Sequence, residues 1–117
     1  MTPEVFVNKY NLHDSMIESL TVENHGSNIR MVIDFAFWMQ EDYRKGHPET
    51  GFLAVSFQNV TEYDCPDQLP LEEISILEAH VQNDSIIIVL LNDITNECCE
   101  IRIKANEITV DDQSEQI

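Results

Sequence analysis

Basic residues are scarce in this chain. Lys and Arg together number 6 against 22 Asp and Glu in 117 residues, which gives a formal net charge of -16 at pH 7. Such a charge is well beyond the magnitude of about 2–8 that suits a small soluble domain. A field of this sign repels nucleic acid and anionic membranes and attracts cations. The composition therefore excludes nucleic acid and membranes as partners and predicts a basic protein.

Glycines and long apolar runs are also scarce. With 3 glycines the chain has no P-loop or dinucleotide fingerprint, and no segment has the spacing of an EF-hand. The longest apolar run, Ile86 to Leu91, is too short to span a bilayer. The opening MTPEVFVNK lacks a basic segment followed by an apolar stretch, so we expect no signal peptide and a cytoplasmic location.

The cysteines do not indicate a disulfide framework. There are 3, Cys65, Cys98 and Cys99, and two of them are adjacent, which is poor geometry for a bridge. We expect free thiols in a reducing compartment. Cys65 has no basic residue within several positions that would activate it, Cys98 and Cys99 are expected to divide between core and surface, and no serine lies in a Gly-x-Ser-x-Gly context. The sequence predicts no catalytic residue, cofactor or metal site, and hence no enzyme.

Hydrophobic residues make up 43% of the chain, which is normal for a folded protein, and the length of 117 residues predicts a single domain over 1–117. Residues 2–10 favour a short helix, with Thr2 as its cap and Pro3 at its first position. Strict alternation over 29–37 is typical of a half-buried strand. One face of this strand would carry Ile29, Met31, Ile33, Phe35 and Phe37.

Further strands are predicted from the same alternation and from turn residues. The pair Asn83-Asp84 favours a two-residue hairpin turn, and the run Ile86 to Leu91 is apolar on both faces, which indicates a central strand. We expect a mainly-β domain with an antiparallel sheet of six or seven strands over 15–110, forming a partial barrel or a sandwich, and an acidic tail over 111–117. The remaining strands are expected at 16–23, 52–63, 74–82, 85–92, 99–104 and 108–110.

Acidic residues gather in two predicted loops, 39–51 and 62–73, with aromatic residues beside them. Aromatic side chains are common anchors of protein interfaces, so these loops are the predicted contact surface for a basic partner. An ordinary solvated surface is the alternative interpretation. The candidate partner-binding residues are Trp38, Glu41, Asp42, Tyr43, Glu49, Glu62, Tyr63, Asp64, Asp67, Glu72 and Glu73.

The adjacent pair His13-Asp14 has two interpretations. It is either an acid-base or metal-binding pair, or a structural junction between the helix and the first strand. No two of the four histidines, His13, His25, His47 and His80, have the spacing of a local ligand pair. The alternatives to a binding protein are a metal-binding or hydrolytic protein that uses His13 and Asp14, and an interaction domain that self-associates through its sheet edges.

The stretch Tyr10 to Ile17 contains a Leu-His-Asp-Ser-x-Ile motif. It resembles the opening of many small, mostly uncharacterised bacterial proteins, some of which are grouped with immunity proteins of polymorphic toxin systems. The resemblance extends loosely to about Val110. It implies a cytoplasmic, mostly-β, non-enzymatic protein that neutralises a toxin domain. It also implies that Leu12, His13, Asp14 and Ser15 are structural residues that tie the first strand to the sheet.

Overall fold

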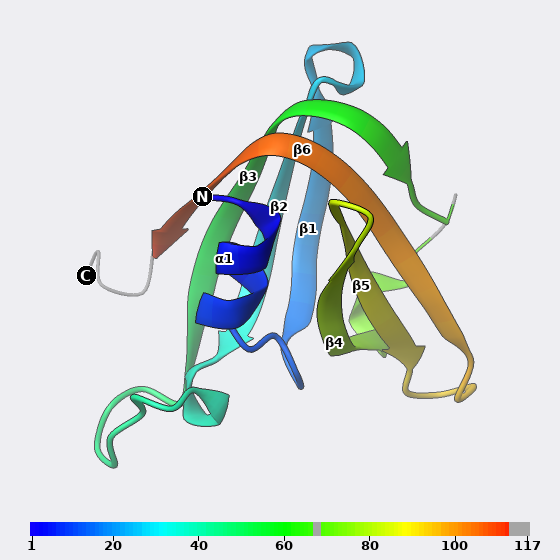
Figure 1. Cartoon of the computed structure of the whole chain (residues 1–117). Helices are drawn as coiled ribbons and strands as arrows, with labels where there is room; N and C mark the ends of the chain where they lie inside the picture. The colour runs from blue at the N-terminus through cyan, green and yellow to red at the C-terminus, as the bar shows by residue number, and fades with distance from the viewer. Residues whose placement is uncertain (67–68, 113–117) are drawn as a thin grey trace.

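The computed structural model describes residues 1–66 and 69–112. One short helix, α1 (Pro3–Lys9), precedes six antiparallel strands in a single sheet, which does not close into a barrel (Figure 1). The mainly-β antiparallel fold with one N-terminal helix is thus confirmed. The order across the sheet is β1-β2-β3-β6-β5-β4. The strands are β1 (Met16–Glu23), β2 (Asn28–Ala36), β3 (Thr50–Asp64), β4 (Ile74–Gln82), β5 (Ser85–Asn92) and β6 (Cys98–Asp112).

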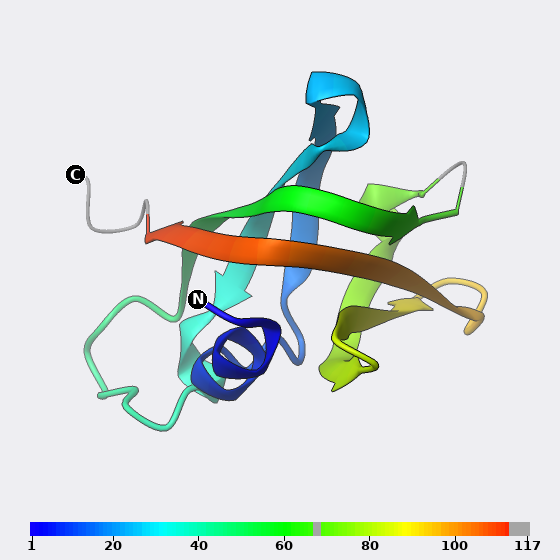
Figure 2. The same cartoon turned by 45° about the horizontal axis from the view of Figure 1, so that its top comes forward.

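The two longest strands, β3 and β6, have 15 residues each and pair with one another in the middle of the sheet. Both bend as they cross the molecule (Figures 1 and 2). Along β6, the alternate residues that face the core are odd-numbered up to Ala105 and even-numbered from Ile108 on, so the alternation changes phase between them. Opposite this point Asn59 of β3 adopts a left-handed φ of 56°. This change of phase explains why the sequence pattern predicts two short strands, at 99–104 and 108–110, where the structure has one.

The core lies on the concave side of the sheet, where α1 covers it (Figure 2). Thr2 caps the helix by accepting a hydrogen bond from the Val5 amide. The helix buries Phe6, whose ring meets Phe57 of β3 edge to face at 6.3 Å between centroids. The inward residues of β2 are buried as predicted up to Phe35, but Phe37 begins a 3₁₀ turn and is half-buried.

The β4–β5 hairpin has the predicted bounds. Its turn residues, Asn83 and Asp84, take φ values of 52° and 64°, as a two-residue turn of this kind requires. Strand β5 lies between β6 and β4 and buries Ile86, Ile87 and Ile88, so its two-sided apolar pattern is confirmed as that of an interior strand. No helix in the described part of the chain is long and apolar enough to cross a membrane.

Candidate functional site

The Leu-His-Asp-Ser motif bridges the two edges of the sheet. The amide of Asp14 donates to the carbonyl of Ile76 in β4 at 2.9 Å, and the amide of Ile76 donates to the carbonyl of Ser15 at 2.8 Å. Both edge strands carry a bulge near this point, after Ile17 in β1 and after Ile76 in β4. The segment before β1 therefore draws together two strands that are otherwise the outermost of the sheet.

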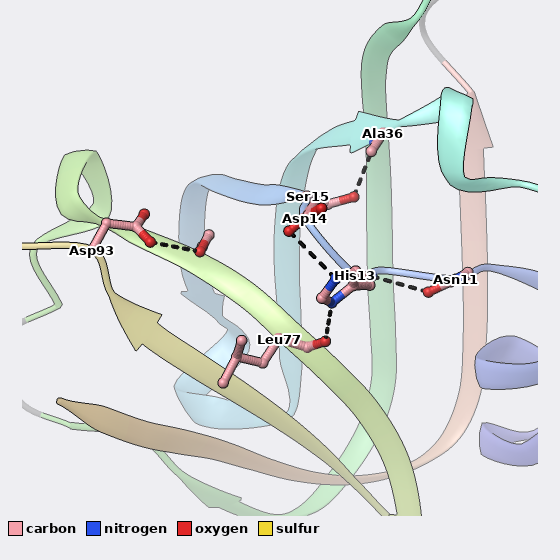
Figure 3. Close-up of polar contacts among 8 residues, drawn as sticks. Asn11, His13, Asp14, Ser15, Ala36, Leu77 and Asp93 are labelled. Atoms are coloured by element: carbon pink, nitrogen blue, oxygen red, sulfur yellow. Dashed lines mark hydrogen bonds and ion pairs between the residues drawn. The ribbon is translucent and has the colours of Figure 1, made fainter. Parts of the chain in front are cut away.

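The motif's side chains extend the bridge (Figure 3). Ser15 is 0% exposed, and its Oγ accepts the amide of Ala36 at the end of β2 at 2.9 Å. His13 Nδ1 lies 2.6 Å from the carbonyl oxygen of Leu77, the bulged residue of β4. A carbonyl only accepts, so Nδ1 carries the proton and donates it. The side chains of His13 and Ser15 are thus hydrogen-bonded to backbone groups of β4 and β2, respectively.

The histidines converge on no metal site in the part of the chain that the structure describes. Among residues 1–66 and 69–112, no group of three His, Cys, Asp or Glu side chains is placed to hold a metal ion. His13 Nε2 lies 3.5 Å from Asp14 Oδ1, and His80 lies 3.5 Å from Glu78. The other two histidines, His25 and His47, are exposed.

The two acidic loops lie at opposite ends of β3 (Figure 1). One loop precedes Thr50 and the other follows Asp64, and a strand advances by about 3.3 Å per residue. The predicted contact residues therefore form two separate groups. The first group is Trp38, Glu41, Asp42, Tyr43 and Glu49; the second is Glu62, Tyr63, Asp64, Glu72 and Glu73, while Asp67 lies outside the described residues.

Basic residues on the neighbouring strand partly offset the negative charge of the second group. In the β3–β6 register, Glu62 lies opposite Lys104 and Asp64 lies opposite Arg102. Tyr63 is 38% exposed, and its burial together with a hydrogen bond to Cys65 raises the pKa of the phenol above its usual range. A cation approaching this end of β3 meets carboxylates that already have basic cross-strand neighbours.

The first group lies on a loop that side-chain hydrogen bonds of Gln40 attach to neighbouring segments. The Gln40 side chain donates to the carbonyls of Asn11 (2.8 Å) and Ala36 (2.9 Å), and its Oε1 accepts the Asn11 amide at 3.0 Å. The amide of Trp38 also donates to the carbonyl of Glu49 at 3.2 Å, while the Trp38 side chain is 45% exposed. The start of the predicted loop 39–51 is therefore attached to the segment that directly follows α1.

A cavity of about 410 Å³ opens between this loop and the end of α1. Its aromatic wall comes from Tyr10, Phe35 and Phe37, and its polar residues include Glu41 and Asp42. Sequence reasoning missed this cavity, because the helix end and the end of β2 lie far apart in the chain. No local spacing signals their approach.

The three cysteines are free, as predicted. Cys65 and Cys99 are half-buried against the core, and Cys98 is exposed. Burial, followed by the neighbouring thiols of Cys65 and Cys98, raises the pKa of Cys99. A raised pKa disfavours the thiolate, which is the reactive form.

Comparison of the chain with protein-family models, with curated proteins and with solved structures finds no match.

Proposed function

We propose that this protein is a non-enzymatic, acidic binding protein, and specifically an immunity protein that neutralises a cationic bacterial toxin. The observation that carries the proposal is the net charge of -16 on a small folded surface. Exposed carboxylates lie on β1, β3, β4 and β6 and on the loops. The exposed acidic residues include Glu18, Glu23, Glu41, Asp42, Glu49, Glu62, Asp64, Glu72, Glu78, Asp93, Glu97, Glu100, Glu107 and Asp111.

These charges are largely uncompensated within the chain. Among the described residues, the ion pairs within 4.0 Å are that of the N-terminal ammonium with Glu107 and two that involve histidines. Clustered like charge destabilises the compact state by self-repulsion. A cationic partner would relieve that repulsion on binding, which supports a docking role over plain solvation.

The geometry of the motif supports the non-enzymatic part of the proposal. The Ser15 hydroxyl accepts a backbone amide, and the His13 ring donates to a backbone carbonyl. Neither arrangement is a nucleophile–base pair. The same geometry agrees with the structural role that the resemblance to immunity proteins implies for these residues.

The negative charge of the surface indicates which class of toxin it would bind. Proteins that act on nucleic acid grip phosphates with Lys and Arg, so their active faces are basic. An acidic surface complements such a face and competes with the substrate for it. We therefore place nuclease-like toxin domains among the partners that the charge suits best.

The test is co-expression with the product of the neighbouring gene. If that product arrests growth, co-expression of this chain restores growth, and titration calorimetry on the purified proteins gives a Kd that rises at least about tenfold between about 50 and 500 mM NaCl. An affinity that does not change with salt would contradict the electrostatic basis. A stable homodimer in light scattering, with no binding of the neighbouring product, would favour the self-associating domain instead.

A further inference from the structure

The cavity at the end of α1 has an aromatic wall of defined geometry. The rings of Tyr10 and Phe35 meet edge to face at 5.9 Å between centroids and 72°, and those of Phe35 and Phe37 at 5.4 Å and 82°. Phe35 is buried, whereas Tyr10 and Phe37 are half-buried. The volume of about 410 Å³ falls within the range of about 300–1,000 Å³ that is usual for ligand pockets.

A basic side chain of the same chain already contacts one of these rings. The ammonium of Lys9 lies 5.5 Å from the centroid of the Tyr10 ring, within the distance of a cation–π contact. The negative face of an aromatic ring attracts ammonium and guanidinium groups alike. The long apolar stem of such a side chain also packs against aromatic surface.

The charges on the cavity favour a cationic occupant. Glu41 and Asp42 line it and are exposed, and within the described residues neither has a basic partner within 4.0 Å. Lys9 is the one basic residue among those that line the cavity, so the lining is net negative. An anionic ligand would meet two carboxylates and one ammonium there.

The cavity is also preorganised. Gln40 holds the loop to both the helix end and the end of β2 through three hydrogen bonds of 2.8–3.0 Å. We call these three hydrogen bonds the Gln40 clamp. The next residues form a turn, in which the amide of Tyr43 donates to the Gln40 carbonyl at 3.1 Å. Glu41 and Asp42 lie between the two anchored residues. A site that is ordered before binding costs less entropy to occupy.

We propose that this cavity receives an arginine side chain of the cationic partner. The apolar stem lies along Tyr10 and Phe37, and the guanidinium is held by Glu41 and Asp42. Arginine suits the site better than lysine because its planar group stacks on rings and bonds carboxylates in pairs. This inference rests on the proposed function for the partner's charge, and it assigns the contact to one of the two acidic ends of β3.

The test uses the full chain labelled with ¹⁵N and titrated with N-acetyl-arginine methylamide, followed by amide chemical shifts. The neutral isostere N-acetyl-citrulline methylamide is the control. We expect saturable shifts confined to residues 8–11 and 35–43, with a Kd on the order of 1–10 mM, and no saturation with citrulline. Equal responses to the two probes, or shifts spread over all acidic segments, would overturn the proposal.

Two charge-matched variants locate the contact. Glu41→Gln/Asp42→Asn removes two charges at the cavity, and Glu62→Gln/Asp64→Asn removes two at the other end of β3. All four residues are exposed, so both variants should fold. We expect the first to weaken binding of the arginine probe about threefold to tenfold and the second less than about 1.5-fold. Equal weakening would show a general field effect and refute a defined site.

The same variants separate the two proposals. If the neighbouring gene product binds with salt dependence but only Glu62→Gln/Asp64→Asn weakens it, the cavity assignment fails and the proposed function stands. If the arginine probe saturates the cavity but no basic protein binds the chain, the proposed function fails and the cavity remains a guanidinium site.

Discussion

Ser15→Ala tests how the sequence motif holds the sheet together. Ser15 is 0% exposed, and its Oγ accepts the Ala36 amide at 2.9 Å. Alanine fits the same space but supplies no acceptor. The substitution therefore leaves a buried N–H without a partner, at the point where the segment before β1 meets the end of β2.

The expected cost follows from that lost acceptor. A buried polar group without a partner destabilises a protein by about 1–3 kcal/mol. With an m-value of about 1.5 kcal/mol/M in urea, a loss of about 2 kcal/mol lowers the unfolding midpoint by about 1.3 M. The m-value itself should not change, because the surface exposed on unfolding stays the same.

The control is Ser27→Ala, which removes an exposed hydroxyl that donates to the Asn24 carbonyl at 2.8 Å. Its effect should stay within about 0.5 kcal/mol, as for most surface changes. Urea unfolding followed by circular dichroism compares the two variants with the parent chain. If Ser15→Ala were as stable as Ser27→Ala, the Ala36 amide would not depend on the Ser15 hydroxyl, and the structural role of the motif would be refuted.

Three further outcomes are expected in the same unfolding assay. His13→Ala removes the donor to the β4 carbonyl and should cost about 1–2 kcal/mol, whereas His47→Ala, in the exposed loop, should cost less than about 0.5 kcal/mol; equal costs would contradict the bridge. Phe57→Ala should lower the free energy of unfolding by about 3–5 kcal/mol, because Phe57 is buried. Phe52 is 45% exposed on the opposite face of β3, so Phe52→Ala should cost less than about 1 kcal/mol. Similar losses for the two variants would refute the assignment of faces. The pKa of Cys99 is raised above its usual 9.0, so the folded state holds the thiol proton more tightly and stability falls as the pH rises above about 9. Cys99→Ser should make that fall shallower between about pH 8 and pH 10, and an unchanged slope would contradict it.

Local patterns predicted the elements whose causes are local. The β4–β5 hairpin has the predicted bounds because alternation marks its strands and Asn83-Asp84 tolerates the positive φ of the turn. Likewise α1 starts where Thr2 and Pro3 predict it. The sequence pattern predicts two strands in place of β6 because its alternation changes phase after Ala105, and pairing with β3 on both sides of this point keeps the strand continuous.

The candidate site was predicted only in part. Most of the described aromatic and acidic residues of the loops are exposed, but Tyr43 and Glu73 are half-buried. Their division into two groups depends on the length of β3. The arrangement of Tyr10 with Phe35 and Phe37 depends on α1 folding back over the sheet. The Gln40 clamp joins residues 29 positions apart, and nothing in the local sequence marks it.

By itself the sequence determined the charge of -16, the strand periodicity and the turns. Those properties follow from residue types and near neighbours, so they can be read along the chain. Only the tertiary structure decided that the two acidic loops lie apart, that the motif joins β1 to β4, and that Glu41 and Asp42 flank an aromatic cavity. These arrangements depend on non-local strand pairing, because it is the pairing of β3 with β6 and the packing of α1 on the sheet that place distant residues together.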